Sequence, residues 1–249
     1  MAKTFIITGA SKGIGLAVTK RLLSQSHNVV LAARSADLLE NIKAQSPKQV
    51  EYVAGDMTDE TIPEKLVTLA VEKFGGLNGV VINHGVLNPK KMADSSLVDL
   101  KHVYNVNVFS NFTMAKAALA ELRKSKGCLI WVSSGASTKA YEGWGAYGSS
   151  KSSVNALSTH IALEEPDITS LALAPGRVDT DMQAALRSEG KDTMGKAVYD
   201  DFVDAYNTGA LLKPEQPGNV IAAFVANPDN DLSGKLVKWN GEEMAAFQQ

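Results

Sequence analysis

The sequence predicts an α/β fold, a doubly wound parallel sheet with helices on both faces. Short, continuous apolar segments alternate with longer segments of helical periodicity along the chain, which is typical of parallel strands buried on both faces. A glycine-rich turn follows the first apolar segment. The 249 residues contain no repeat, low-complexity tract or Pro/Gly linker. We therefore expect a single domain over residues 1–249.

The expected strands are short apolar runs. The first, Lys3–Thr8, holds Phe5-Ile6-Ile7, and the fifth, Cys128–Val132, ends at a pair of serines. Runs of about four to eight apolar residues are consistent with the strands of a buried parallel sheet. The other expected strands cover residues 29–33, 50–54, 80–83, 168–174 and 235–239.

The expected helices carry apolar residues at spacings of three and four. In the first, residues 13–24, these include Ile14, Val18 and Leu22. The other expected helices cover residues 38–44, 62–74, 97–123, 146–163 and 217–225. Residues 181–213 lack clear strands and follow the sixth one, so we expect them to form a mobile lid on the substrate side.

The composition argues against several classes of partner. The chain is 45% hydrophobic and 21% charged, with a net charge of −2 and no basic patch, so no nucleic acid is expected. No apolar run approaches the ~18 residues of a membrane span, and no signal peptide precedes the first strand. The single cysteine, Cys128, suits a reducing compartment, which favours a cytoplasmic location. The four histidines lack metal-ligand spacing, so no metal is expected.

The residues after the first strand form a candidate phosphate-binding turn. They read Thr8-Gly-Ala-Ser-Lys-Gly-Ile-Gly15 and open a helix. Glycines there permit a tight turn and close approach to a phosphate, which the helix N-terminus attracts. In a doubly wound fold this variant of the dinucleotide fingerprint favours cofactor binding over an ordinary strand–helix turn. The expected contacts are Gly9, Ser11, Lys12, Gly13, Ile14 and Gly15.

The end of the second strand favours NADP(H). It reads Ala32-Ala33-Arg34-Ser35 and lacks the carboxylate that usually holds the ribose 2′-hydroxyl of NAD. Arg34 can bind a 2′-phosphate, and Lys12 adds a second cation. Asp56, followed by Met57 after the third strand, is placed to accept a hydrogen bond from the adenine amino group. Asp56 can equally be a helix N-cap.

Tyr147 and Lys151 are a candidate catalytic pair. If residues 146–163 form a helix, the two side chains share one face, about 6 Å apart along the axis. A nearby ammonium favours the phenolate, so Lys151 is expected to lower the pKa of Tyr147. A phenol tuned toward neutral pH can act as a general acid or base. The spacing alone is equally consistent with an ordinary tyrosine beside a solvated lysine.

The chain resembles the short-chain dehydrogenase/reductase family along nearly its whole length. The motifs that carry the resemblance are Thr8-Gly-x-x-x-Gly-x-Gly, Asn83-x-Gly85, Asn107, Ser134, Tyr147-x-x-x-Lys151 and Pro175-Gly176. The resemblance implies a Rossmann domain with a seven-stranded parallel sheet. It also implies that further residues bind the cofactor, namely Asn83, Gly85, Tyr147, Lys151, Pro175, Gly176, Val178 and Thr180.

The same resemblance implies a catalytic tetrad of Asn107, Ser134, Tyr147 and Lys151. Tyr147 would pass the proton, and Ser134 would polarise the substrate oxygen. Lys151 would bind the nicotinamide ribose and lower the pKa of the tyrosine, and Asn107 would hold a water that links the lysine to solvent. Ser133 is the alternative to Ser134, which we prefer because its interval to Tyr147 is the family's usual one.

Two segments narrow the resemblance. Trp144–Lys151 and Ala174–Gln183 look like those of fungal benzil reductases and, more distantly, sepiapterin reductases. Sepiapterin reductases anchor the pterin through an aspartate near the last strand, where Lys238 stands here, and this weakens the pterin hypothesis. A further departure is Asn83-His84-Gly85, where the family has Asn-Ala-Gly. We assign His84 no catalytic role.

The expected function is NADPH-dependent reduction of a small, largely apolar ketone or diketone of the benzil type, with Tyr147 as proton donor. The alternatives are a pterin ketone reductase, which Asp181, Asp200 and Asp204 keep open, an NAD-dependent alcohol oxidation and a non-catalytic NADP-binding regulatory protein. The expected substrate pocket is lined by Tyr141, Trp144, Met182, Leu186, Met194, Val198, Tyr199, Phe202 and Tyr206.

The resemblance also predicts a homodimer, or a homotetramer, through the two long helices at 97–123 and 146–163. The first of these carries Phe109, Phe112, Met114, Ala115, Ala118 and Leu119. These residues offer more apolar surface than one buried face requires. Burial on the sheet is the alternative explanation, because helices on a doubly wound sheet are themselves largely buried.

Overall fold

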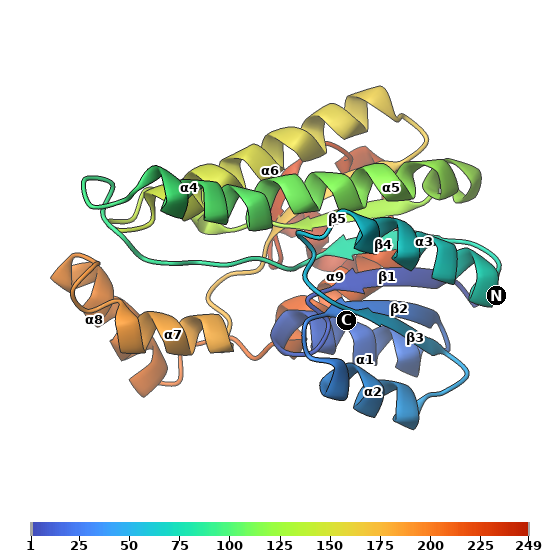
Figure 1. Ribbon diagram of the computed structural model, residues 1–249, viewed down its shortest axis with the longest axis horizontal. Helices are drawn as coiled ribbons and strands as arrows, with labels where there is room; N and C mark the ends of the chain where they lie inside the picture. The colour runs from blue at the N-terminus through green and yellow to red at the C-terminus, as the bar shows by residue number, and fades with distance from the viewer. Residues whose placement is uncertain (1, 249) are drawn as a thin grey trace.

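The computed structural model describes residues 2–248 and confirms the predicted fold class (Figure 1). Seven strands form one sheet in the order β3-β2-β1-β4-β5-β6-β7, and every neighbouring pair is parallel. The strands are β1 (Thr4–Thr8), β2 (Asn28–Ala33), β3 (Val50–Ala54), β4 (Gly79–Ile82), β5 (Cys128–Val132), β6 (Thr169–Ala174) and β7 (Leu236–Lys238). The strand order reverses between β1 and β4, where open parallel sheets form a crevice for ligands.

The helices cover both faces of the sheet, with α3, α5 and α6 on one face and α1, α2 and α9 on the other (Figure 1). The α-helices are α1 (Gly13–Ser24), α2 (Ala36–Gln45), α3 (Thr61–Phe74), α4 (Leu97–Tyr104), α5 (Ser110–Ser125), α6 (Gly145–Glu164), α7 (Asp181–Glu189), α8 (Lys196–Asn207) and α9 (Glu215–Ala226). The ends of the strands and of α1, α2, α3, α6 and α9 lie within about two residues of the predicted ones, whereas α7 and α8 were not predicted as helices. None of the helices described is long and apolar enough to cross a membrane.

Each face of the sheet has its own apolar core. On one side, Val18 and Leu22 of α1 are fully buried together with Phe224 of α9. Fully burying such a side chain contributes roughly 1.5–3 kcal/mol. Glycine at position 218 lets the two helices approach closely, since a Cβ there would lie only 2.7 Å from the Cβ of Ala17. The other core joins α3, α5 and α6 to the opposite face of the strands.

The segment predicted as one helix over 97–123 is helical but not continuously α-helical. A π-helical turn, η1 (Asn105–Phe109), separates α4 from α5. The backbone N–H of Ser110 bonds to the carbonyl of Asn105, five residues back, so one extra residue is accommodated. The prediction of an uninterrupted helix is therefore wrong at this turn, which contains Asn107.

The predicted lid consists of α7 and α8, which extend past the C-terminal ends of the strands (Figure 1). Its two ends are joined to each other, since Leu212 N–H donates to the carbonyl of Arg177 at 2.9 Å and Asp179 N–H donates to the carbonyl of Leu212 at 2.8 Å. Phe202 of α8 is buried against Trp144, with ring centroids 5.2 Å apart. The lid therefore lies against the body of the protein over the strand ends.

Candidate active site

A cavity of about 560 Å³ lies between the strand ends and the lid. It is lined by Gly9, Ser11, Lys12, Gly13, Ile14, Arg34, Asp56, Met57, Asn83, Gly85, Ser134, Tyr147, Lys151, Pro175, Gly176, Val178 and Thr180. These are the predicted site residues except Gly15 and Asn107. The structure brings them together because the carboxyl ends of parallel strands meet at one edge of the sheet.

The turn between β1 and α1 requires glycine at three places. Gly9 and Gly13 have φ angles of +63° and +52°, which residues with a Cβ rarely adopt. A Cβ on Gly15 would lie 2.3 Å from the carbonyl oxygen of Gly9, and one on Gly13 would lie 3.0 Å from Cγ2 of Thr180. The first turn of α1 carries no acidic residue. This bare helix N-terminus beside the cavity fits the phosphates of a dinucleotide.

Arg34, directly after β2, and Asp56, shortly after β3, both line the cavity. Asp56 accepts hydrogen bonds from the backbone N–H and hydroxyl of Thr58, at 2.9 and 2.8 Å. These bonds lower the pKa of Asp56, and the charge of Arg34 lowers it further. Asp56 thus orders the turn after β3 rather than capping α3, which begins at Thr61.

Lys12, predicted as the second cation for a 2′-phosphate, has a different partner. Its Nζ lies 2.8 Å from a carboxylate oxygen of Asp181, at the start of α7. Both side chains are mostly exposed, so this ion pair contributes little to stability, on the order of 0–1 kcal/mol. The pair joins the phosphate-binding turn to the lid.

Tyr147 and Lys151 lie one turn apart on α6, as predicted, and both are buried. The Nζ of Lys151 is 5.9 Å from the centre of the Tyr147 ring and donates to the carbonyl of Val132 at 2.7 Å. The hydroxyl of Ser134 lies close enough to that of Tyr147 to act on its pKa, and the Oγ of Ser134 accepts from the N–H of Ala136 at 3.1 Å. Ser133 instead donates to Oδ1 of Asn155 at 2.5 Å. Of the two serines, Ser134 therefore has its hydroxyl at the tyrosine.

The predicted lowering of the Tyr147 pKa by Lys151 is wrong in this structure. Burial raises the pKa of Tyr147, and the Ser134 hydroxyl opposes this effect only in part. Burial also lowers the pKa of Lys151 to about 8, because a low-dielectric environment disfavours the charged form of either group. Tyr147 thus stays a protonated phenol through neutral pH.

The part of the cavity beside α6 and the lid is aromatic and apolar. Of the predicted lining residues, Tyr141, Trp144, Met182, Leu186 and Phe202 face it. The prediction fails for the other four. Met194, Val198 and Tyr199 pack within the core beneath the lid, and Tyr206 is half exposed. Lys238 of β7 does not line the cavity either.

Several lining residues were missed from the sequence, among them Val86, Leu87 and Val106. Val86 and Leu87 directly follow the Asn83-x-Gly85 motif, so their position was available as a signal. Val106 faces the cavity from the π-helical turn, which no sequence pattern indicated. Among the residues that the structure describes, no cluster of His, Cys, Asp and Glu side chains is suited to a metal ion.

Comparison with known proteins identifies the family. A family model described as short chain dehydrogenase matches residues 3–191. The chain belongs to this family. A benzil reductase ((S)-benzoin forming) of Saccharomyces cerevisiae, IRC24, is 34% identical to this short-chain dehydrogenase, and the alignment covers 100% of both chains. A diacetyl reductase [(S)-acetoin forming] of Staphylococcus epidermidis is 30% identical over 97% of this chain and 98% of the relative.

Solved structures agree with the family assignment. The crystal structure of the Saccharomyces cerevisiae short chain dehydrogenase/reductase YIR035C superposes on this short-chain dehydrogenase with a TM-score of 0.97. The two sequences are 32% identical, and the superposition covers 100% of each chain. The seven-stranded parallel sheet is therefore the fold of the family.

Asn107 is buried in the π-helical turn and holds the loop after β4. Its Oδ1 accepts from the N–H of Val86 at 2.8 Å, and its Nδ2 donates to the carbonyl of Val86 at 2.9 Å and to Oγ of Ser150 at 3.0 Å. A Cβ on Gly85 would lie 3.1 Å from Oδ1 of Asn107 and 3.6 Å from Nζ of Lys151. Glycine at 85 thus lets the lysine, the loop and Asn107 meet.

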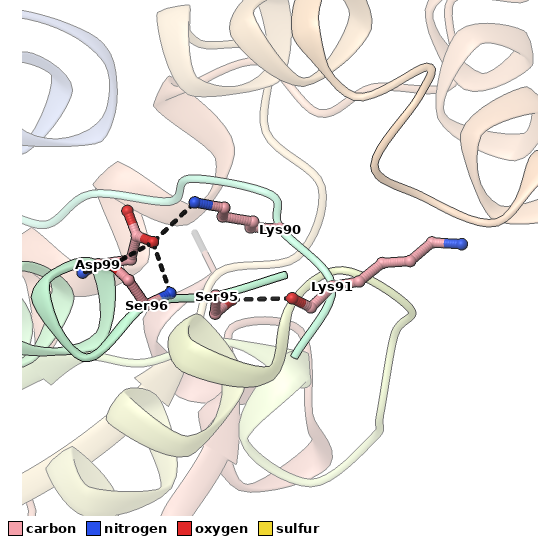
Figure 2. A network of polar contacts seen from close by, with 5 residues as sticks. All are labelled: Lys90, Lys91, Ser95, Ser96 and Asp99. Atoms are coloured by element: carbon pink, nitrogen blue, oxygen red, sulfur yellow. Dashed lines mark hydrogen bonds and ion pairs between the residues drawn. The ribbon is translucent and has the colours of Figure 1, made fainter. Parts of the chain in front are cut away.

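The rest of that loop is fixed by a polar network, which Figure 2 shows around Asp99. One carboxylate oxygen of Asp99 accepts from Nζ of Lys90 at 2.7 Å and from the N–H of Ser96 at 2.8 Å. These bonds hold the pKa of Asp99 well below its usual range. The N–H of Lys90 also donates to the carbonyl of Gly143 at 2.7 Å. The network therefore ties the loop carrying Val86 to the segment that leads into α6.

Proposed function

We propose that this short-chain dehydrogenase is an NADPH-dependent carbonyl reductase that acts as a single domain over residues 1–249. The observation that carries the proposal is that Ser134, Tyr147 and Lys151 line one cavity together with the glycine turn after β1. One end of the cavity suits the cofactor and the other suits an apolar substrate. The two proposed catalytic hydroxyls lie between them.

The proposed reaction uses these groups in distinct roles. The glycine turn after β1 and Arg34 would hold NADPH, which would supply a hydride to the carbonyl carbon. Tyr147 transfers its hydroxyl proton to the carbonyl oxygen, and Ser134 donates a hydrogen bond to the same oxygen. The protonated phenol of Tyr147, which burial favours, is the form that donates a proton during reduction. Lys151, with a pKa of about 8, is mostly charged at neutral pH and is placed to bind the nicotinamide ribose.

Arg34 supports the choice of NADPH. It lines the cavity directly after β2, and neither Ala33 before it nor Ser35 after it supplies a carboxylate to accept the ribose 2′-hydroxyl of NAD. A guanidinium binds phosphate oxygens in a two-pronged geometry. Lys12 can add a second contact only by leaving Asp181.

The substrate that fits best is a small vicinal diketone with apolar substituents, of the benzil type. Trp144 stands edge-on to Tyr147, with ring centroids 5.7 Å apart, and tilted against Phe202. Such walls suit an aryl or alkyl ketone and exclude water from the reacting carbonyl. Two relatives are named for vicinal diketones, benzil and diacetyl.

The acidic groups give the alternative pterin substrate little support. Asp181 is paired with Lys12, and Asp200 with Lys196 at 2.5 Å. Each carboxylate is thereby directed to a lysine on the protein surface. A pterin reductase nonetheless remains the second candidate, because Asp181 borders the cavity.

A substrate and variant panel tests the proposal. The wild type, Tyr147→Phe and Tyr52→Phe are assayed with NADPH on benzil, diacetyl, acetophenone and sepiapterin. Tyr52→Phe is the matched control, since it removes a hydroxyl that bonds Glu40 and is not part of the cavity lining. We expect Tyr147→Phe to lose about 10²–10⁴-fold in kcat while NADPH still binds. Preference for sepiapterin would refute the diketone, and no turnover of any carbonyl by the wild type would favour a regulatory NADP-binding protein.

The described surface also supports a homodimer. Leu97, Val98, Phe109 and Phe112 are exposed on α4, η1 and α5, by 43–75%. The predicted surface was partly wrong, because Met114, Ala115 and Ala118 are fully buried in the protein's own core. The exposed group nonetheless forms an apolar strip that a second copy would cover. The cytoplasmic location stays a prediction.

A further inference from the structure

The His84 ring bridges two parts of the site that are far apart in sequence. Its Nδ1 lies 2.7 Å from Oγ1 of Thr8, the last residue of β1, and its Nε2 lies 2.8 Å from Oγ of Ser110, the first residue of α5. The residue lines the cavity between the phosphate-binding turn and the π-helical turn. Both ring nitrogens therefore have a partner inside the protein.

The neighbouring bonds assign the proton to one nitrogen. The hydroxyl of Ser110 donates to the carbonyl of Val106 at 2.6 Å, so it accepts from His84, which places the ring proton on Nε2. Nδ1 then accepts from the hydroxyl of Thr8, because the other acceptor within reach of that hydroxyl, the carbonyl of Val81, is more distant at 3.4 Å. Burial and the charge of Lys151 lower the pKa of His84 to about 3, against a smaller opposing effect of Asp56. The ring is thus neutral at physiological pH.

Each end of this bridge controls a functional segment. On one side, Oγ1 of Thr8 accepts the N–H of Asn83 at 2.9 Å, and the Asn83 side chain donates to the carbonyls of Thr8 and Gly9. On the other side, the Ser110 hydroxyl donates to the carbonyl of Val106, the residue before Asn107. Because a π-helical turn leaves local backbone groups without their α-helical partners, such a bond stabilises it.

We propose that His84 is a positioning residue that holds the phosphate-binding turn and the π-helical turn of Asn107 in their relative positions. Its ring nitrogens bond Thr8 and Ser110, and not Tyr147 or Ser134. It acts through Thr8 on cofactor binding and through Ser110 on Asn107, and so on the loop that brings Gly85 to Lys151. The kinetic part of this inference rests on the proposed reductase activity, whereas the binding and spectroscopic parts do not.

Two amide substitutions separate the two ends. In His84→Asn the side-chain amide takes the place of Nδ1, so it can bond Thr8 but does not extend to Ser110. In His84→Gln the amide nitrogen takes the place of Nε2 and can bond Ser110. We expect His84→Asn to keep near wild-type NADPH affinity and to slow single-turnover hydride transfer about threefold to tenfold, the effect of one net hydrogen bond. His84→Gln should show the reverse, with weaker NADPH binding and near wild-type hydride transfer, and His84→Ala should be impaired in both. A control, His27→Ala, removes a histidine that accepts from the N–H of Lys3 away from the cavity.

Binding is measured by NADPH fluorescence titration, and folding by thermal melts of each variant. A purely structural role would lower the melting temperature of all the His84 variants without separating affinity from hydride transfer, and that result would overturn the proposal. Ser110→Ala should slow hydride transfer as His84→Asn does, and combining it with His84→Ala should add less than the product of the two effects. If the double variant instead showed the full product of the two single effects, that result would also count against the bridge.

The tautomer gives a readout without turnover. In ¹⁵N NMR of the protein without added cofactor, the His84 ring should show a protonated Nε2 and an unprotonated Nδ1 from pH 8 down to pH 5. Titration of His84 near the ordinary histidine pKa of ~6.5 would overturn the assignment even if the protein proves not to be a reductase. If the wild type reduces no carbonyl but this signature and the NADPH affinity split are present, the proposed function fails and the bridge stands.

Discussion

Replacing Lys151 with methionine should stabilise the fold while impairing catalysis. Lys151 is 4% exposed, and burial lowers its pKa from 10.5 to about 8. At roughly 1.4 kcal/mol per pKa unit, keeping this ammonium charged in the folded protein costs about 3 kcal/mol below pH 8. Its bond to the carbonyl of Val132 returns part of this cost, about 1 kcal/mol. Methionine fills similar space without a charge, so we expect a net gain of about 2 kcal/mol at pH 7.

The pH dependence gives the sign of the effect. Between about pH 8 and pH 10.5 the unfolded chain holds a proton on Lys151 that the folded chain has released. The free energy of unfolding of the wild type therefore increases, because of this group, as the pH rises through that window. Lys151→Met lacks this contribution, and all other titrating groups are shared. The advantage of the variant should be largest below pH 8 and shrink toward pH 10.

The assay is urea unfolding of the cofactor-free proteins at pH 7 and pH 10, with thermal melts in parallel. A gain of 2 kcal/mol corresponds to roughly 4–8 °C in melting temperature for a chain of this size. Lys126→Met is the control, because that side chain is 76% exposed and lies 3.5 Å from Asp167, so its removal should matter by less than about 0.5 kcal/mol. The reasoning would be refuted if Lys151→Met were no more stable than the wild type at pH 7 and if the difference in stability between the two proteins did not change with pH.

Three further predictions concern cofactor choice, the serine and the assembly. Arg34→Asp should erode or reverse a preference for NADPH over NADH, measured as the ratio of kcat/KM values; equal values in the wild type would contradict the assignment. Ser134→Ala should reduce kcat about 10²-fold or more, whereas Ser133→Ala should mainly lower the melting temperature because it breaks the bond to Asn155; a larger kcat loss in Ser133→Ala would exchange their roles. Phe109→Glu with Phe112→Glu should convert a dimer to a monomer in light scattering at micromolar concentration, and a monomeric wild type would refute the dimer.

Local sequence signals were sufficient for the architecture. Apolar runs and helical periodicity placed the seven strands and the helices packed on the sheet to within about two residues, because burial on both faces of a parallel sheet imposes its pattern on the sequence directly. They did not indicate α7, α8 or the π-helical turn between α4 and α5. The glycine turn was also readable, since positive φ at Gly9 and Gly13 and the close approach at Gly15 leave few other residues possible. The i, i+4 spacing of Tyr147 and Lys151 likewise followed from helix geometry alone.

Only the tertiary structure decided what depends on contacts between distant segments. The pKa of Tyr147 rises rather than falls because packing buries the pair, and spacing along one helix carries no information about burial. Lys12 contacts Asp181, 169 positions away in the chain. His84 contacts Thr8, 76 positions away, and Ser110, 26 positions away. Hydrogen bonds and desolvation depend on distances in space, and the folded chain sets these through elements that the local sequence does not relate.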